Sequence, residues 1–248
     1  ELNREIFKLL GVRYSTKRNR ADQAPAETIE TGLASCTGLS ILLVDACRSV
    51  GVPARLAGTP NWVNKSGNHT WVEVWDDGWH FAGAAEPDSR GLDHGWFQGR
   101  AAQAIEDSPE HAIYAMSFRK TGTSFPLVWA PGIAYVSAVN VTGRYVSAGA
   151  KPPEKPRLLV KVFDEKDGER VVRSVELIDR ADLEKVLRGN SRDESNDTND
   201  ILSFKVEKGR AYDLRILDGK RVLSREYRCG GSRQDVVSIF LGDPSPRK

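Results

Sequence analysis

The sequence predicts an α+β protein in which a buried helix packs on an antiparallel sheet, followed by a small all-β domain. The helix is predicted from CTGLSILLVDACRSV, residues 36–50, which is apolar on most of its faces and is followed by Gly51. The sheet is predicted from residues 69–75, where polar and apolar residues alternate, and from the hairpin signal Asp77-Gly78, after which residues 79–85 form the returning strand. The all-β domain is predicted from short strand-like segments near the end of the chain, most of them separated by Gly or Asp turns.

The length and the charge of the chain exclude several classes of function. A chain of 248 residues is long enough for two domains that each bury a core. Its 36 Lys and Arg residues are balanced by 34 Asp and Glu residues and are interspersed with them, so we expect no nucleic-acid partner. No apolar run approaches the roughly 20 residues that span a bilayer, so we expect no membrane span.

Shorter elements complete the first predicted domain, residues 1–150. Helical patterns occur at residues 6–10 and 27–33, with a polar loop at 15–24 between them. A short strand is expected at 52–57, after the glycine that ends the long helix. Further strands, rich in aromatic and β-branched residues, are predicted at 112–119 and 133–141.

The second predicted domain, residues 151–248, begins with KPPEKP at 151–156, which cannot pair in a sheet and favours an extended linker. A short helix is predicted at 179–188, and an exposed flexible loop at 189–200, which is rich in Ser, Asn and Asp. We interpret the remaining strand-like segments as a small β-sandwich; they lie at 158–163, 171–177, 202–206, 212–217, 222–227 and 236–241.

Cys36 is the strongest candidate for a chemical role. The chain has three cysteines, too few for a disulfide scaffold and odd in number, so at least one thiol is expected to be free within the chain. Cys47 lies inside the apolar helix and Cys229 at a strand end, where we expect structural roles. Cys36 stands at the start of the helix, where unpaired amide hydrogens and the positive end of the dipole stabilise a thiolate. Simple packing at a helix end is the alternative.

His69 and an acidic residue supply the partners that a cysteine nucleophile needs. An imidazole takes and returns the proton, and a carboxylate holds the imidazole in the required tautomer. If residues 77 and 78 form a two-residue turn, the strand register places His69 directly opposite Glu86, with Cβ atoms about 4.5–5.5 Å apart. A register slip of one residue would instead leave Glu73 or Asp88 as the acid.

Substrate contacts are predicted for Gln23, Trp62, Asn68 and Trp71. The backbone N–H of Cys36 is the natural first donor to an oxyanion, and Gln23 or Trp62 could supply the second. Trp71 could wall a cleft, with Asn68 at its rim. The simpler explanations are solvent exposure for the two amides, packing against a loop for Trp62 and core packing for Trp71.

No metal or cofactor is expected. A metal site could only be assembled from Cys36, His69, His80 and His94, and the paired Cys-x-x-Cys or His-x-x-x-His spacing of such sites does not occur.

The segments CTGLSILLVDACRSVGVPAR, GNHTWVEVW and DGWHFAGAAEP, with their surroundings from about residue 11 to 130, resemble the transglutaminase-like superfamily of papain-fold cysteine enzymes. In that family a Cys begins the central helix, a His leads a strand, and an acid, usually Asp before Pro, lies on the next strand. The resemblance implies that Cys36 is the nucleophile, His69 the general base and Glu86 the orienting acid. The chain departs from the family in having Glu instead of Asp and a longer spacing between Trp79 and this acid.

The resemblance also implies an activity. It is that of a cysteine-dependent hydrolase, or acyl transferase, that cleaves an amide bond in a peptide or protein through a thioester acyl-enzyme, with hydrolysis preferred. The alternative is a catalytically weak papain-like module that binds protein or carbohydrate. Contact with carbohydrate or protein is the role open to the second domain, and an appended domain of this kind suggests an extracellular or periplasmic location.

Overall fold

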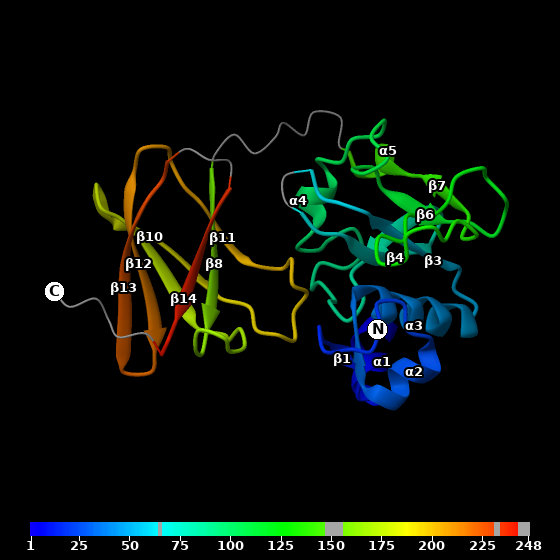
Figure 1. Cartoon of the computed structure of the whole chain (residues 1–248), viewed down its shortest axis with the longest axis horizontal. Helices are drawn as coiled ribbons and strands as arrows, with labels where there is room; N and C mark the ends of the chain where they lie inside the picture. The colour runs from blue at the N-terminus through cyan, green and yellow to red at the C-terminus, as the bar shows by residue number, and fades with distance from the viewer. Residues whose placement is uncertain (64–65, 147–155, 231–233, 243–248) are drawn as a thin grey trace. The chain divides into compact units, whose positions relative to one another are not determined.

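The computed structural model describes residues 1–63, 66–146, 156–230 and 234–242. The chain forms two compact units, Glu1–Ala150 and Lys151–Lys248, and mixes helices with a larger share of strands (Figure 1). Of the segment predicted as a linker, 151–156, residues 151–155 lie outside the described residues. Among the described helices, none is both long and apolar enough to cross a membrane.

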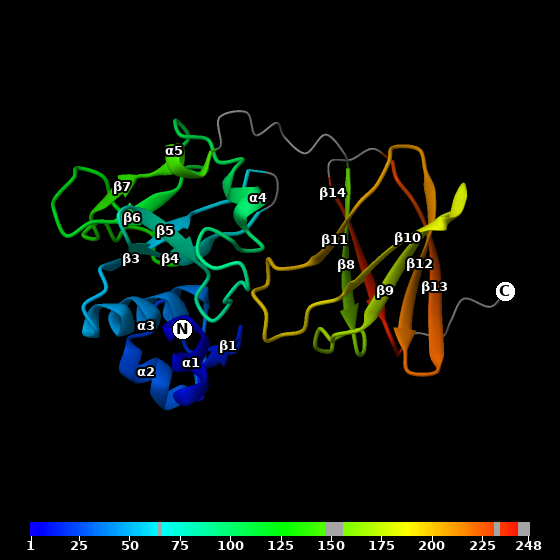
Figure 2. The same ribbon diagram turned by 180° about the vertical axis from the view of Figure 1, so that it is seen from behind.

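The helices of the first unit begin with α1 (Leu2–Leu9), α2 (Pro25–Thr31) and α3 (Cys36–Ser49), and two four-residue helices follow later, α4 (Gln98–Ala101) and α5 (Thr142–Tyr145). The bounds of α3 agree with the helix predicted from its apolar sequence, and most of its residues are buried. Figures 1 and 2 both show α1, α2 and α3 on the same face of the sheet.

The first unit is built on a five-stranded antiparallel sheet with the strand order β5-β4-β3-β6-β7. The strands are β3 (Ala54–Thr59), β4 (His69–Trp75), β5 (Trp79–Ala82), β6 (Tyr114–Met116) and β7 (Ala138–Asn140). A separate parallel pair joins β1 (Arg13–Tyr14) to β2 (Leu33–Ala34) just before α3. The strands predicted at 112–119 and 133–141 are therefore present but shorter than expected.

Alternation along β4 divides the interior of this unit into two cores. Val72 lies in the core beneath α3, together with Leu39 of that helix. Trp71 lies in a second, aromatic core with Phe97. Since successive side chains of a strand point to opposite faces, His69 lies on the face of Trp71. The imidazole therefore enters the aromatic core and not the core beneath the helix.

The β4–β5 hairpin differs by one residue from the predicted register. Trp75 lies opposite Trp79, so the loop consists of residues 76–78 instead of two residues. This longer loop is possible because Asp77 adopts the left-handed conformation, with a φ of 51°, which Asp tolerates. β5 then ends before Glu86, and the predicted pairing of Glu86 directly opposite His69 is wrong.

The second unit consists of two sheets that share one hydrophobic core. Their strand orders are β10-β9-β12-β13 and β11-β8-β14. Each sheet contributes side chains to this core, for example Val160 of β8 and Leu214 of β12. The strands are β8 (Arg157–Phe163), β9 (Ser174–Asp179), β10 (Asp182–Asn190), β11 (Leu202–Lys205), β12 (Ala211–Asp218), β13 (Arg221–Arg228) and β14 (Gln234–Phe240).

The helix predicted at 179–188 is wrong, because this segment forms the hairpin between β9 and β10. Asp182 lies opposite Asp179, and the pairing continues to Asn190 opposite Ser174. The segment contains the helix formers Leu, Glu, Lys and Arg. Pairing with β9 gives the segment backbone hydrogen bonds and contact with a buried strand. These contributions outweigh its preference for a helix, which amounts to a few tenths of a kcal/mol per residue.

The loop predicted to be exposed and flexible is organised around Arg170, of which only 5% is exposed. Its guanidinium donates to the backbone oxygens of Asn196 at 2.8 Å, Asp197 at 3.5 Å and Asp200 at 3.4 Å. Its Nε also lies 3.4 Å from a carboxylate oxygen of Glu194. The planar guanidinium of Arg170 thus provides hydrogen bonds for loop carbonyls that lie outside the strands.

We expect Arg170→Ala to lower the free energy of unfolding by about 2–4 kcal/mol, because the loop carbonyls and the Glu194 carboxylate lose buried hydrogen bonds. Urea denaturation measures this loss. The matched control is Arg188→Ala, since Arg188 pairs with Glu176 at 2.8 Å with 68% of its side chain exposed. Such a surface pair contributes at most about 1 kcal/mol. Equal losses for the two variants would contradict the structural role of Arg170.

Candidate active site

Cys36 is the first residue of α3, and the residue before it forms the helix cap. The side chain of Ser35 accepts hydrogen bonds from the amides of Thr37 at 3.1 Å and Gly38 at 3.2 Å, and it donates to the backbone oxygen of Ala21. Within the described ranges, the amide nitrogen of Cys36 itself has no hydrogen-bond acceptor. The helix start therefore presents a thiol and an available N–H at the same point.

His69 opens β4 and lies beside the thiol. A ring nitrogen of His69 and the Sγ of Cys36 are within 4.8 Å of each other. Two buried hydrogen bonds hold the helix and the strand together here. The hydroxyls of Thr37 and Thr70 are 2.9 Å apart, and Ser40 donates to the backbone oxygen of Thr70 at 3.2 Å. Because these threonines directly follow Cys36 and His69, the bonds fix the relative position of thiol and imidazole.

Aromatic rings surround the imidazole, of which 2% is exposed. The ring centroid of His69 lies 4.8 Å from Trp96, 5.0 Å from Phe97, 5.8 Å from Trp71 and 6.1 Å from Trp62. Packing on several sides restricts the rotation of the ring, so the imidazole is held in one orientation. Trp96 was not singled out by the sequence, which showed only that most tryptophans cluster near His69.

Glu86 follows a tight turn after β5. Its amide donates to the backbone oxygen of Gly83 at 3.2 Å, and Ala85 in this turn has a left-handed φ of 63°. The indole N–H of Trp96 donates to Oε2 of Glu86 at 2.8 Å. Trp96 therefore contacts the carboxylate with its N–H and the imidazole of His69 with its ring. The acid reaches the aromatic core from a turn and not from the paired strand that the sequence predicted.

Glu73, the first alternative acid, lies in a buried network of ion pairs and hydrogen bonds on the face of β4 that also carries His69. Its carboxylate lies 2.7 Å from Arg55 and 3.2 Å from Arg144, and it accepts a hydrogen bond from the hydroxyl of Tyr145 at 2.7 Å. Burial and the charge of Glu73 raise the pKa of Tyr145 well above its usual value. Trp71 donates to the same hydroxyl at 2.8 Å, so the network also orients an indole that packs on His69.

Asp88, the second alternative, forms a local ion pair. Arg90 donates to its two carboxylate oxygens at 2.9 and 2.7 Å, and these hydrogen bonds hold the pKa of Asp88 below its usual range. This pair lies at the surface and joins neighbours in the chain, so it positions no other part of the site.

The four predicted substrate contacts fall in different environments. Gln23 is buried, and its Nε2 donates to the backbone oxygen of Leu33 at 3.0 Å and to Thr31 at 3.2 Å, so its amide hydrogens already have acceptors. The role of Gln23 as a second donor to an oxyanion stays a prediction. Trp62 and Trp71 stack with centroids 6.3 Å apart as core residues, and Asn68 lies half-buried next to His69 in the chain.

His80 does not join His69. It lies opposite Val74 in the hairpin, which places it on the other face of the sheet. Its Nδ1 lies 2.6 Å from a carboxylate oxygen of Asp93, and this hydrogen bond raises the pKa of His80.

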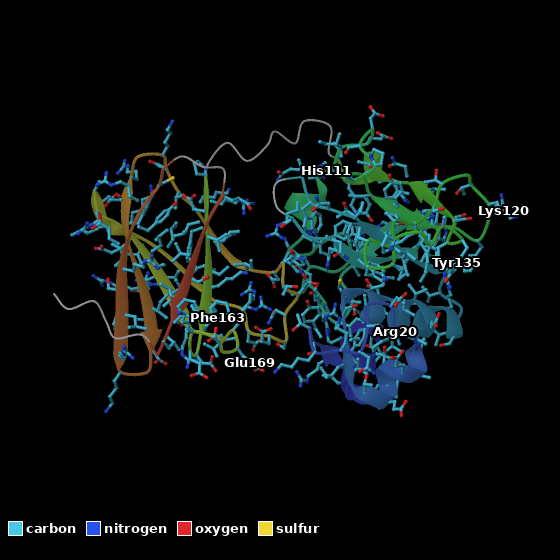
Figure 3. All side chains as sticks on the ribbon, viewed as in Figure 1. Arg20, His111, Lys120, Tyr135, Phe163 and Glu169 are labelled. Atoms are coloured by element: carbon cyan, nitrogen blue, oxygen red, sulfur yellow. The ribbon has the colours of Figure 1, made fainter. Side chains whose placement is uncertain are left out.

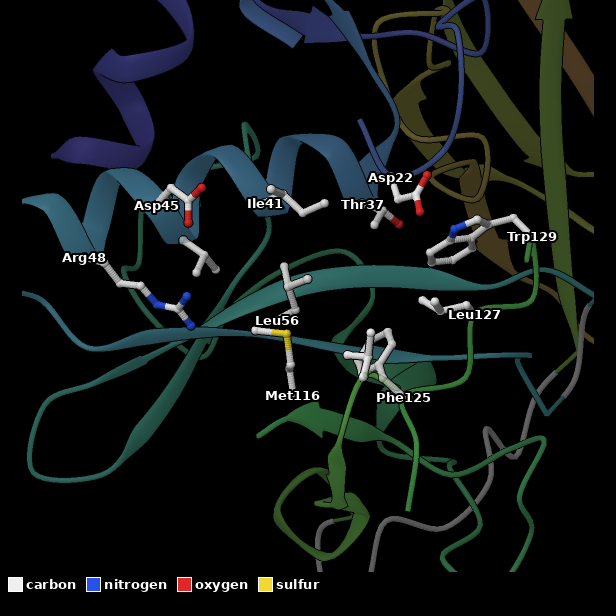
Figure 4. Close-up of a pocket in the computed structure, with 12 residues that line it drawn as sticks. Asp22, Thr37, Ile41, Asp45, Arg48, Leu56, Met116, Phe125, Leu127 and Trp129 are labelled. Atoms are coloured by element: carbon white, nitrogen blue, oxygen red, sulfur yellow. The ribbon is translucent and has the colours of Figure 1, made fainter. Parts of the chain in front are cut away.

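A cavity of about 280 Å³ lies along the face of α3 (Figure 4). Thr37 and Asp22 stand at one end and Arg48 at the other. Thr37, at one end of the cavity, is the residue that directly follows Cys36 in the chain. The remaining walls are mostly apolar and include Ile41, Val44, Leu56, Met116, Phe125, Leu127, Trp129 and Val136.

The segment that borders this cavity, residues 117–137, exposes large apolar side chains. Phe118 is 83% exposed and Tyr135 is 81% exposed. Figure 3 labels Tyr135 on the first unit.

Comparison with known proteins agrees with the resemblance noted in the sequence. Residues 4–84 match the model of the transglutaminase-like superfamily, a range that includes both Cys36 and His69. The solved crystal structure of a group B streptococcus pilus 2b backbone protein aligns at 11% identity over 77% of this chain and 78% of that chain. Its TM-score of 0.24 supports no conclusion on fold or function. No curated protein sequence matches the chain.

We expect iodoacetamide to label Cys36 alone in the native protein near neutral pH. Cys36 is partly exposed, whereas 6% of Cys47 and 1% of Cys229 are exposed, and burial raises the pKa of the Cys47 thiol. A raised pKa leaves less thiolate to react. Peptide mapping by mass spectrometry measures the labelling, with urea-unfolded protein as the control in which all three thiols react. Labelling of Cys47 as fast as Cys36 would contradict this expectation.

Proposed function

We propose that this chain is a cysteine-dependent hydrolase of amide or peptide bonds, of the transglutaminase-like type. The main support for the proposal is the proximity of thiol and imidazole: the Sγ of Cys36 and a ring nitrogen of His69 lie within 4.8 Å of each other. Both groups stand at the start of regular elements that hydrogen bonds tie together. The family match over residues 4–84 supports the same assignment.

The proposed reaction has two stages. His69 takes the proton of Cys36, and the thiolate attacks the carbonyl carbon of the amide. The backbone N–H of Cys36 donates to the oxyanion that forms. His69 returns the proton to the leaving amine, the C–N bond breaks and a thioester remains. His69 then removes a proton from water, the hydroxide attacks the thioester, and the acid leaves as the thiol is regenerated.

Glu86 is the proposed orienting acid. An orienting carboxylate stabilises the imidazolium that forms during catalysis. Glu86 qualifies because the side chain that binds its carboxylate, Trp96, also packs on the imidazole of His69. Glu73 is less suitable, since two guanidinium groups already neutralise it.

The proposal assigns a papain-like core to the first unit and a β-sandwich to the second. The packing of α3 on the antiparallel sheet supports the first assignment. The single core shared by two sheets supports the second. We place the enzyme outside the cytoplasm, with the second unit contacting carbohydrate or protein.

The cavity beside α3 is the proposed site for an apolar side chain of a peptide substrate. Its apolar walls and its position next to the residue that follows Cys36 support this role. An apolar side chain bound there would hold the neighbouring amide bond near the thiol.

We expect Cys36→Ala to abolish hydrolysis of a peptide-amide library and His69→Ala to reduce kcat by about 10²–10⁴-fold, the usual contribution of a general base. Release of amine measures turnover, and intact-protein mass spectrometry detects the thioester. Cys47→Ala is the control, because that thiol lies in the core beneath α3 and is expected to leave turnover unchanged. Full turnover in Cys36→Ala would rule out the proposed mechanism.

We expect Ile41→Asp to lower the preference for peptides with Leu over Ser beside the cleaved bond by about 10–200-fold, because a carboxylate replaces an apolar wall of the cavity. The ratio of kcat/KM for paired peptides measures this preference. Ser49→Asp adds the same charge at an exposed position of the same helix and is expected to leave the ratio unchanged. An unaltered ratio in Ile41→Asp would remove the cavity from the substrate site.

A further inference from the structure

Gly83 occupies the position from which a side chain would enter the core beside His69. β5 ends with Ala82 opposite Val72 of β4. The next residue in the same register, Gly83, therefore falls opposite Trp71 and on the face that Trp71 shares with His69. Any side chain at this position would point into the aromatic core.

The carboxylate of Glu86 fills the space that the missing side chain leaves. A Cβ atom at Gly83 would lie 2.6 Å from Oε2 of Glu86 and 3.1 Å from its Cβ. Real Cβ atoms essentially never approach another heavy atom as closely as the first of these distances. The carboxylate can lie here only because residue 83 has no side chain.

Two side chains, those of Asn3 and Trp96, hold the turn and the carboxylate in this arrangement. The side chain of Asn3, in α1, donates to the backbone oxygen of Gly83 at 2.8 Å and accepts from the amide of Ala85 at 2.9 Å. The indole of Trp96 donates to Oε2 of Glu86 at 2.8 Å. Asn3 thus holds the backbone of the turn, and Trp96 holds the carboxylate of Glu86.

We infer that Gly83, Asn3 and Trp96 are positioning residues that bring the carboxylate of Glu86 from outside the strand to the face of His69. This inference rests on the proposed hydrolase function, in which Glu86 is the orienting acid, and accounts for how a carboxylate from beyond the end of β5 comes to the face of the sheet that carries His69. The turn compensates for a register that leaves Glu86 out of the paired strand. Gly83 and Asn3 act through Glu86, Trp96 acts through Glu86 and by packing on the imidazole of His69, and none of the three touches substrate.

Gly83→Ala tests the inference with little change to the fold. The clashing Oε2 is the far end of a flexible side chain, and Gly83 does not have a left-handed φ, so alanine fits the backbone. We expect the methyl group to displace the carboxylate and to lower kcat about 10²-fold with KM unchanged, as misplacement of a catalytic group does. The thermal unfolding midpoint is expected to stay close to the wild-type value.

A double-mutant cycle with Glu86→Ala separates positioning from a general structural effect. If Gly83 acts through Glu86, the double variant is as slow as Glu86→Ala alone, so the two losses do not multiply. Gly99→Ala is the matched control, because a Cβ at Gly99 meets no atom within 4 Å, and it is expected to keep wild-type kcat. The alkylation rate of Cys36 by iodoacetamide, measured in each variant, is expected to fall in Gly83→Ala and Glu86→Ala together.

The outcomes distinguish the inference from the proposed function. Wild-type kcat in Gly83→Ala, or losses that multiply in the double variant, would overturn the positioning role while leaving the hydrolase intact. Wild-type turnover no higher than that of Cys36→Ala would overturn the hydrolase itself. In that case the alkylation rates decide the inference, since equal rates in the wild type and Gly83→Ala would show that residue 83 does not act on the thiol–imidazole pair.

Discussion

The buried contact between Thr37 and Thr70 is the interaction on which the geometry of the site depends. The two hydroxyls are 2.9 Å apart although 33 positions separate them in the chain. Thr37 directly follows Cys36 and Thr70 directly follows His69, so their bond sets the approach of the start of α3 to the start of β4. A buried hydrogen bond of this kind is costly to leave unmade, which favours one arrangement of helix and strand. The thiol and the imidazole meet as a consequence.

The second constraint is the neutralisation of a buried carboxylate, Glu73, four residues along β4 from His69. Glu73 lies on the same strand face as His69, with 2% of the residue exposed, and an unpaired carboxylate would be very unfavourable there. Arg55, Arg144 and the hydroxyl of Tyr145 satisfy it. The same hydroxyl holds Trp71 against His69. The network therefore satisfies a buried carboxylate and holds in place an indole that packs on His69.

Local sequence patterns predicted those elements whose cause is local. The apolar run of α3, the alternation of β4 and most strands of the second unit follow from periodicity and turn residues. The segment that forms β10 shows where this reasoning fails, since its residues favour a helix while a neighbouring strand offers hydrogen bonds and burial. The loop at 76–78 shows it again, because one left-handed residue, Asp77, changes the register of every later pair.

The sequence by itself determined which residue types the site contains and where two of them begin their elements. Cys36 at a helix start and His69 at a strand start are properties of short segments, which is why both could be predicted. The tertiary structure decided which partners these side chains take. The side-chain amide of Gln23 donates to the backbone of Leu33. Glu86 follows a turn that Asn3 binds from 80 positions away in the chain. Such contacts depend on the packing of whole elements, so no local pattern records them.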